Sequence, residues 1–307
     1  MEGFAEVLQD SVRRFPFTPP PILRYPQMAM ALNHTGRNIS YLCNFPWQFW
    51  SLDKDPADGG DWVGEFCHAW RTGGDARPGY GAALGYVDQS EKYASQVPSG
   101  PGRWNHLDSL EIGNNQSFVD ENGIVQSGPT MTESQAQTIF SLFVIVKSPL
   151  FIGASAINLT GYSLATYLNT EVIAVHQDPL GARGGRLPDS SALRPCGEAW
   201  AVQNADGGAA VALVNRDANS ACNLTFSLAE VPGLLTETTT AATATTVATE
   251  RQLKKGAAAC FTVRDLWKHA DAGKITSADK TFPITEVAPT GIVMVRLTPC
   301  PGGDDSE

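Results

Sequence analysis

A carboxylate follows a guanidinium by four residues in the segment 67–75, whose sequence is CHAWRTGGD. A carboxyl group placed in this way can exchange a proton with a bound molecule, and the arginine can hold either that molecule or the carboxyl group. An aspartate after two glycines is also a common turn former, and its arginine neighbour is often a surface partner. The segment therefore makes Asp75 the candidate catalytic acid and leaves the turn interpretation open.

The elements around this segment suggest how Asp75 is placed. Residues 38–42 have the composition of a short strand, and this strand ends at Cys43. Helical spacing of Trp62, Val63, Phe66 and Trp70 predicts a helix over residues 61–70. We therefore expect Asp75 to lie on a loop that follows a helix.

The chain continues with further α/β signals. Residues 132–135 fit a capping box, and apolar residues then follow at helical spacing: Ile139, Leu142, Phe143 and Val146. Residues 150–152 are predicted to be a buried strand, and residues 170–175 a short helix. Alternating strands and helices of this kind are typical of an α/β domain.

The pattern changes near residues 185–188, where several glycines loosen the chain. Strand-like runs separated by turns follow at 200–202, 209–214, 223–228, 260–263 and 291–297, and they predict a small antiparallel sandwich. Residues 236–249 are almost entirely Thr and Ala, so we expect an exposed or partly disordered insertion there. The predicted domains are residues 1–187 and 188–307.

Composition excludes several classes of function. The 307 residues carry a formal net charge of -10 and no basic stripe, which argues against binding to nucleic acid. No run approaches the ~18 apolar residues of a membrane span, and the first residues do not resemble a signal peptide. The histidines are scattered singly, so the sequence predicts neither a metal site nor a cofactor.

Cysteines and glycosylation signals nevertheless favour an oxidising compartment. The chain has 6 cysteines without metal-type spacing, and N-glycosylation sequons begin at Asn33, Asn38, Asn115, Asn158 and Asn223. We therefore expect the protein in the secretory pathway, in a lysosome or vacuole or outside the cell, although an export signal is absent from the sequence as given.

Ordered phrases along the chain carry a specific resemblance. They are RYP at 24–26, ALNHTGR at 31–37, YLC at 41–43, WRTGGD at 70–75, GRWN at 102–105, VIAVHQDPLG at 172–181, VRDLW at 263–267 and VRLTP at 295–299. In this order, they resemble the α-galactosidases of glycoside hydrolase family 27. The resemblance implies a (β/α)8 barrel followed by an antiparallel β-sandwich, and retaining hydrolysis of terminal α-linked galactose in a glycan or glycolipid.

The resemblance also implies roles for particular residues. A retaining mechanism uses two carboxyl groups about 5 to 5.5 Å apart, one as nucleophile and one as acid and then base. By position in the motif, Asp75 resembles the acid/base and Arg71 a contact to a sugar hydroxyl. Cys43 and Cys67 match a disulfide-bonded pair in the family, and this bridge would hold the segment that leads to Asp75.

Three candidate residues depart from the family pattern. The family nucleophile lies in a Lys-aromatic-Asp context, whereas Asp10, the aspartate nearest in position, lacks both the lysine and the aromatic residue. Asn44 stands where α-galactosidases often have Glu and α-N-acetylgalactosaminidases often have Ser, so it decides neither sugar. Trp47 lies closest to the strand end where a sugar would stack, although aromatic residues at this density also fill a core.

Two further departures concern the motif after Trp104 and the length of the barrel. The family usually reads Trp-Asn-Asp-Pro-Asp-Met-Leu, but residues 104–110 read WNHLDSL, and we interpret Asp108 as structural. A complete barrel takes about 250 residues, so we expect the second half of a barrel, in a chain whose beginning is missing. The sequence leaves open an α-N-acetylgalactosaminidase, a non-catalytic carbohydrate-binding relative, and a homodimer.

Overall fold

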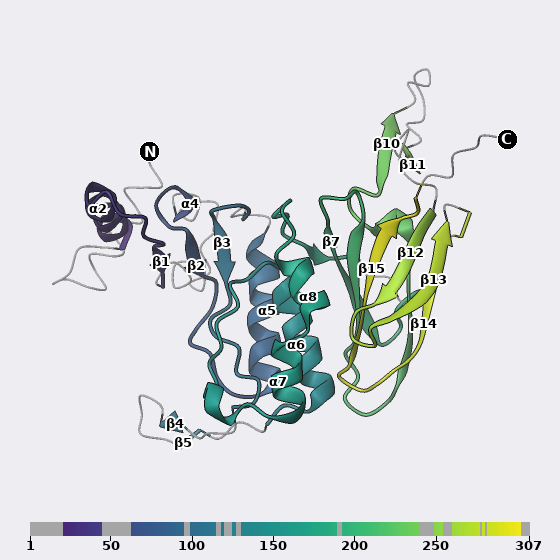
Figure 1. The fold of residues 1–307 in the computed structure, drawn as a ribbon, viewed down its shortest axis with the longest axis horizontal. Coiled ribbons are helices and arrows are strands. Elements are labelled where there is room, and N and C mark those ends of the chain that lie inside the picture. Colours follow the sequence, from purple (N-terminus) through teal and green to yellow (C-terminus); the bar gives the residue numbers. More distant parts are fainter. Residues whose placement is uncertain are drawn as a thin grey trace. The chain divides into compact units, whose positions relative to one another are not determined.

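The computed structural model describes residues 21–44, 63–94, 99–114, 118–119, 125–126, 130–188, 192–239, 249–253, 260–276, 278–279 and 281–301. The chain forms two compact units, which we name the parallel unit (residues 1–130 and 148–156) and the sandwich unit (residues 131–147 and 157–307). In Figure 1, parallel strands and helices come first along the chain, and antiparallel strands follow. This order agrees with the predicted fold class, while the boundary between residues 187 and 188 stays a prediction.

A parallel sheet of three short strands organises the first unit. Its order is β1 (Leu42–Cys43), β2 (Ala69–Arg71) and β3 (Trp104–His106). Cys43 pairs with Trp70, and Trp70 with Asn105, so these side chains point to the same face of the sheet. A further parallel bridge joins Leu110 to Ile152 beyond the end of β3. In a parallel sheet the carboxyl ends of all strands lie at one edge, which is where the candidate residues follow.

Helices α2 (Pro21–His34), α4 (Val63–Phe66) and α5 (Tyr80–Ala94) supply apolar side chains to this unit. Its small core contains five buried side chains, Cys43, Val63, Cys67, Trp70 and Tyr93, with Tyr25, Tyr41 and Phe66 packed against them. The Cys43–Cys67 disulfide, the pair that the resemblance implies, joins β1 to the residue after α4. A hairpin of β4 (Phe118–Val119) and β5 (Val125–Gln126) completes the described strands of this unit.

Two sequence-based expectations for this unit are wrong. The helix predicted over residues 61–70 is a single described turn, α4, and Trp70 lies instead in β2, because residues 69–71 pair with strands on both sides. Residues 150–152 are not a buried strand, since Phe151 and Ile152 are 47% and 49% exposed and only Ile152 forms a bridge. Asp75 therefore follows a strand rather than a helix.

The sandwich unit begins with helices and continues with strands. The helical segments are α6 (Glu133–Ile145), η2 (Ala156–Asn158, which begins in the parallel unit), α7 (Gly161–Tyr167), α8 (Thr170–His176) and η3 (Leu228–Glu230). The strands are β6 (Gly185–Arg186), β7 (Gly197–Gln203), β8 (Ala209–Asn215), β9 (Cys222–Phe226), β10 (Leu235–Thr239), β11 (Thr249–Leu253), β12 (Cys260–Asp265), β13 (Ala270–Thr276), β14 (Phe282–Val287) and β15 (Ile292–Pro299).

Six of these strands form one antiparallel sheet in the order β13-β12-β15-β8-β7-β6, and β14 pairs with β9 in a second sheet. Alternate residues from both sheets, including Val211, Phe226 and Val263, form one buried core, as the sandwich prediction requires. All seven residues of β8 are buried. The face of the six-stranded sheet that points away from this core therefore needs a second cover.

Helix α6 supplies this cover within the sandwich unit. Its Thr138 hydroxyl lies 2.9 Å from the carbonyl oxygen of Thr290, and Trp267 donates from Nε1 to the Ser141 hydroxyl at 2.9 Å. The predicted capping box is confirmed, because Thr132 and Gln135 exchange hydrogen bonds of 3.2 and 3.1 Å. The helix predicted at 170–175 is also confirmed as α8.

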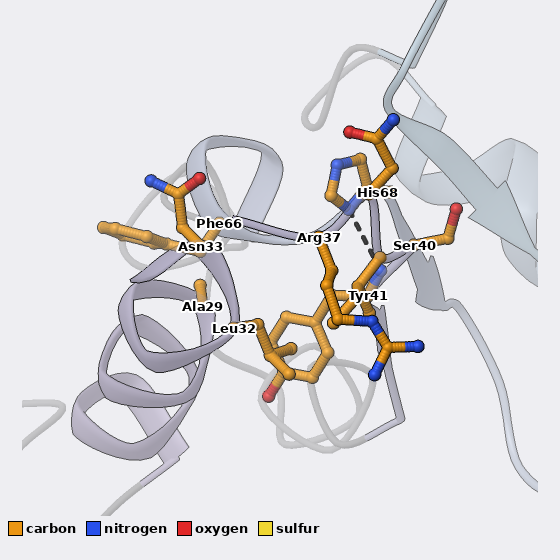
Figure 2. A pocket seen from close by; sticks show the side chains of 10 residues that line it. Ala29, Leu32, Asn33, Arg37, Ser40, Tyr41, Phe66 and His68 are labelled. Carbon is orange, nitrogen blue, oxygen red and sulfur yellow. Dashed lines mark hydrogen bonds between the residues drawn. The ribbon is translucent and has the colours of Figure 1, made fainter. Parts of the chain in front are cut away.

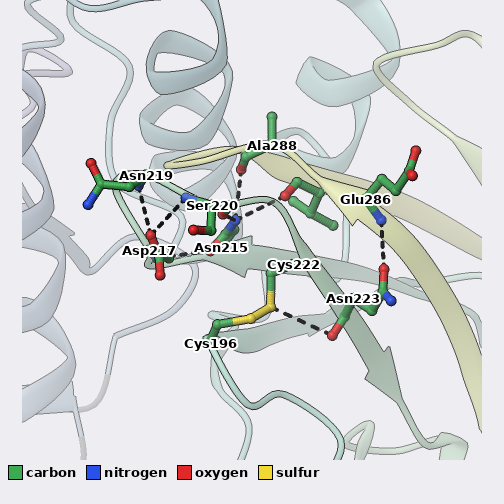
Figure 3. The surroundings of a disulfide bond; sticks show 10 residues. Cys196, Asn215, Asp217, Asn219, Ser220, Cys222, Asn223, Glu286 and Ala288 are labelled. Atoms are coloured by element: carbon green, nitrogen blue, oxygen red, sulfur yellow. Dashed lines mark hydrogen bonds between the residues drawn. A yellow bond between two sulfur atoms is a disulfide. The ribbon is translucent and has the colours of Figure 1, made fainter.

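Two disulfides resolve the cysteine pairings that the sequence left open in this unit. Cys196 is bonded to Cys222, and Cys260 to Cys300. Figure 3 shows the first bridge below the side chain of Asn215, which is fully buried and whose Nδ2 lies 2.8 to 3.1 Å from the carbonyl oxygens of Ser220, Val287 and Ala288. A buried amide is stable there because its hydrogens have acceptors.

The Thr- and Ala-rich segment is partly structured. Its two ends belong to the antiparallel pair of β10 and β11, and residues 240–248 lie outside the described residues. None of the described helices is long and apolar enough to cross a membrane.

Candidate active site

Two candidate residues, Asn44 and Asp75, and a third polar residue, Asp108, follow the carboxyl ends of neighbouring parallel strands. Asn44 comes directly after β1, Asp75 lies on the loop after β2, and Asp108 comes two residues after β3. The loops at this edge carry the reacting groups in barrels of parallel strands. The parallel unit therefore gathers the candidate residues at one edge of its sheet.

Arg71, the last residue of β2, holds the loop that carries Asp75. Its side chain is only 10% exposed. One terminal nitrogen donates to the carbonyl oxygens of Gly73, at 3.3 Å, and of Gly74, and lies 3.5 Å from Asp75 Oδ1. The other terminal nitrogen lies 2.8 Å from Asp108 Oδ2. Arg71 thus links the ends of two strands.

Asp75 itself is open to solvent, with its side chain 87% exposed. Its backbone is held from both sides, because the Tyr86 hydroxyl donates to the carbonyl oxygen of Asp75 and the next amide, of Ala76, donates to Asp108 at 2.6 Å. The carboxylate therefore projects freely from a loop that is fixed by its neighbours. This arrangement suits a group that must meet an incoming molecule.

Asp108 has a larger part in this site than the sequence indicates. Its carboxylate accepts from the Ala76 amide and pairs with Arg71, and its backbone has the left-handed φ of 72°. That conformation is uncommon outside glycine, although Asp and Asn adopt it more readily than other residues. The only sequence signal was the aspartate retained within the altered motif at residues 104–110.

The charge of Arg71 is shared unequally between the two aspartates. Asp108 lies 2.8 Å from the guanidinium and is 22% exposed, whereas Asp75 lies 3.5 Å away and is largely in water. Coulomb attraction is stronger at the shorter distance and in the less hydrated setting. Arg71 is therefore neutralised mainly by Asp108.

His106 is the last residue of β3 and lies two residues before Asp108. Burial, reinforced by the positive charge of Arg71, lowers its pKa from 6.5 to about 4. Its Nδ1 accepts a hydrogen bond of 2.7 Å from the amide of Asp108, and its ring stacks on Phe151 at 5.2 Å between centroids. His106 is therefore a neutral acceptor that fixes the backbone of Asp108, a role that its position alone did not indicate.

Gly73 allows the loop to lie close to α5. A Cβ at this position would come within 2.9 Å of Gln89 Oε1 and 3.1 Å of the Tyr86 ring, whereas a Cβ at Gly74 would meet nothing within 4 Å. The two glycines of the motif therefore differ in what they contribute. Gly73 is needed for packing against α5, and Gly74 has open space beside it.

The remaining candidates have unequal support. Asn44 is exposed and directly follows the carboxyl end of β1. Asp10 and Trp47 lie outside the described residues. Within the described part of the chain, no group of His, Cys, Asp and Glu side chains is placed to hold a metal ion.

Comparison with protein families decides the affiliation of the chain. The family described as alpha galactosidase A matches residues 21–178, and the alpha galactosidase C-terminal beta sandwich domain matches residues 196–297. The chain belongs to the α-galactosidase family. These α-galactosidase matches cover both the parallel strands with Asp75 and the strands of the sandwich.

Individual α-galactosidases and their relatives agree with this affiliation. Alpha-galactosidase 3 of Arabidopsis thaliana is 33% identical over 258 residues, which are 84% of this chain and 48% of the plant protein. An alpha-N-acetylgalactosaminidase of Gallus gallus is 32% identical over 165 residues, which are 53% of this chain and 37% of that protein. The chain spans about half the length of the curated relatives it matches.

The fold is similar to that of a solved α-galactosidase. Alpha-galactosidase I from Mortierella vinacea superimposes with a TM-score of 0.65 at 20% identity, covering 92% of this chain and 64% of that one. At this identity the likeness concerns the fold, a parallel α/β region followed by an antiparallel sandwich.

Proposed function

We propose that this chain provides the acid/base part of a retaining α-galactosidase, with Asp75 as the acid/base. The observation that carries the proposal is the held loop after β2, where an exposed carboxylate projects beside a buried arginine in the WRTGGD motif. A general acid must reach the glycosidic oxygen, and the Asp75 side chain is 87% exposed although Arg71 lies 3.5 Å from its Oδ1. The family membership supports a galactoside as substrate.

In this mechanism Asp75 protonates the departing oxygen while a second carboxylate attacks the anomeric carbon. Asp75, now a carboxylate, then takes a proton from the water that releases the sugar with its original anomeric configuration. Arg71 is proposed to contact a sugar hydroxyl, as its position in the WRTGGD motif suggests. Its terminal nitrogens are engaged with the loop and Asp108.

Asp10 is the proposed nucleophile, and Asn44 and Trp47 are proposed contacts to the sugar. The role of Asn44 is supported by its position at the same edge of the sheet as Asp75. The roles of Asp10 and Trp47 rest on the resemblance in sequence. The substrate proposed is a terminal α-galactoside of a glycan or glycolipid. The three disulfides support folding in the secretory pathway, and a lysosome, a vacuole or the extracellular space is the proposed destination.

The test is to measure hydrolysis by this chain of nitrophenyl α-galactoside and nitrophenyl α-N-acetylgalactosaminide, and to follow the anomer released by proton NMR. We expect faster release from the galactoside, with α-galactose as the first product. A preference for the acetylated sugar would show that the substrate is an α-N-acetylgalactosaminide and not an α-galactoside. Release of β-galactose would exclude a retaining mechanism.

One alternative is a carbohydrate-binding relative without catalysis, which is favoured by the loss of the lysine and aromatic residue beside Asp10. This alternative predicts saturable binding of galactose without hydrolysis, and weaker binding when Arg71 is replaced by Met. If the chain neither hydrolyses nor binds galactosides, both proposals are wrong.

A further inference from the structure

A pocket of about 330 Å³ lies in the parallel unit away from the Asp75 loop. Its wall is formed by the end of α2, by residues 37–41, which lead into β1, and by Phe66 and His68, which precede β2. These residues mark the amino ends of the parallel strands, whereas Asp75 follows a carboxyl end. The pocket is therefore separate from the candidate active site, and its volume is within the range of small-molecule sites.

The charge of this pocket is opposite to that of the chain. The described residues that line it include the basic side chains of Arg37 and His68 and no carboxylate, although the chain has a net charge of -10. The Arg37 guanidinium makes no hydrogen bond or ion pair within the described residues, and the Arg37 backbone amide donates to the Thr35 hydroxyl at 3.2 Å. In Figure 2 the Arg37 side chain extends past Tyr41, and no dashed line reaches its guanidinium.

His68 has one ring nitrogen committed to the fold. Its Nδ1 accepts a hydrogen bond of 3.0 Å from the amide of Tyr41, which Figure 2 draws as a dashed line. In the neutral ring Nε2 then carries the proton and is a donor. Arg37 and His68 thus offer donors, and no acid in the lining competes for them.

The rest of the lining suits a polar ring. Asn33, Asn38 and Ser40 provide amide and hydroxyl groups, and Tyr41 and Phe66 provide aromatic faces. Pyranose rings use hydrogen bonds at their hydroxyls and pack their apolar faces on aromatic side chains. A planar guanidinium binds carboxylate or phosphate oxygens in pairs.

We propose that this pocket binds a monosaccharide that carries an anionic group, either a carboxylate or a phosphate ester, through Arg37 and His68. The site is distinct from the site of hydrolysis and does not depend on the function proposed above. The shared requirement is an oxyanion attached to a sugar ring, and the two kinds of anion are compared in the test.

The test is isothermal titration of the whole chain with D-glucuronate, D-glucose 6-phosphate and neutral D-glucose. The protein is produced in the bacterial periplasm, where disulfides form and no N-glycan is attached at Asn33 or Asn38. We expect saturable binding of at least one anion and none of glucose. Arg37→Gln should weaken binding of that anion at least tenfold, and Arg37→Lys should have an intermediate effect because it retains charge without the planar fork.

The matched control is Lys274→Gln, which removes one positive charge from an exposed residue of β13 and should change the affinity less than twofold. Absence of saturable binding by both anions would overturn the proposal. It would also be overturned if Arg37→Gln bound as tightly as the unaltered chain, or if glucose bound as tightly as the anions.

Discussion

At the scale of single residues, the candidate site depends on how one guanidinium is shared. Arg71 lies 2.8 Å from Asp108 and 3.5 Å from Asp75, and Asp108 also accepts from the amide that follows Asp75. Asp108 therefore acts on Asp75 in two ways, by neutralising Arg71 and by fixing the loop. The sequence predicted that Arg71 and Asp75 act together, but it did not predict the contact of Arg71 with Asp108. This contact joins the ends of β2 and β3, which are far apart in the sequence.

Replacing Asp108 by Asn tests its positioning role. The side-chain oxygen of Asn can still accept a hydrogen bond from the Ala76 amide, and Asn tolerates the left-handed backbone. However, Asn carries no negative charge, so the ion pair with Arg71 is lost. The loop that carries Asp75 is then held less firmly, and we expect kcat/KM to fall at least tenfold while the chain stays folded. Steady-state kinetics with an α-galactoside measure this fall, circular dichroism checks the folding of the variant, and an unchanged kcat/KM would contradict a positioning role for Asp108.

His106 predicts a dependence of stability on pH. Its pKa is about 4 in the folded chain against 6.5 for the free group, so below pH 6.5 the unfolded chain binds a proton that the folded chain does not. The contribution of neutral His106 to the free energy of unfolding should be fully present above pH 6.5. The free energy of unfolding should then fall by up to about 3 kcal/mol as the pH decreases towards 4. Urea unfolding at pH 7 and 4.5 measures this loss, which should be smaller in His106→Asn; equal losses would contradict the assignment.

At the scale of elements, pairing between strands determines the conformation of residues 69–71, which hydrophobic periodicity alone predicted wrongly. The helical spacing of residues 62–70 is real, but Ala69–Arg71 pairs with β1 on one side and β3 on the other, and these sheet hydrogen bonds override the local pattern. Helix α6 was predicted correctly because a capping box marks its start and apolar residues follow at helical spacing, and α8 because the segment 176–179 marks its end. Short strands of two or three residues carry too little pattern to be found alone.

The two glycines before Asp75 provide a matched test of the loop. Gly73→Ala would place a methyl group 3.1 Å from the Tyr86 ring, so we expect a loss of about 1 kcal/mol and a displaced loop. Gly74→Ala has no neighbour within 4 Å and should change stability by less than about 0.5 kcal/mol. Denaturant unfolding of both variants checks this order, and similar losses in the two would show that α5 does not constrain the loop.

At the scale of the whole molecule, the sequence pattern changes from alternating strands and helices to strands alone, and this change predicted an α/β region followed by a β-sandwich. The family matches at residues 21–178 and 196–297 agree with this order. The sequence could not predict that α6 belongs to the sandwich unit, because this depends on contacts such as that of Trp267 with Ser141. Nor could it choose among the pairings of the last four cysteines, which strand order determines.

The disulfides predict that the two units respond separately to cysteine loss. Joint replacement of Cys43 and Cys67 by Ser releases a bridge over 24 residues and should cost about 3 kcal/mol, lowering hydrogen-exchange protection in β1 and β2. The same change at Cys260 and Cys300 is the control, and it should lower protection in β12 and β15 instead. Loss of protection in both units from either change would contradict separate units.

The most direct test of the central claim is the effect of Asp75→Asn on the hydrolysis of two α-galactosides. One should have a leaving group that needs protonation, such as methanol, and the other a dinitrophenolate that departs without a proton. Asn keeps the size of the side chain but cannot donate an acidic proton, so we expect hydrolysis of the methyl galactoside to fall at least about 100-fold. Cleavage of the dinitrophenyl bond should be much less affected. Near-normal turnover of the methyl galactoside by the variant would contradict the assignment of Asp75 as the acid/base.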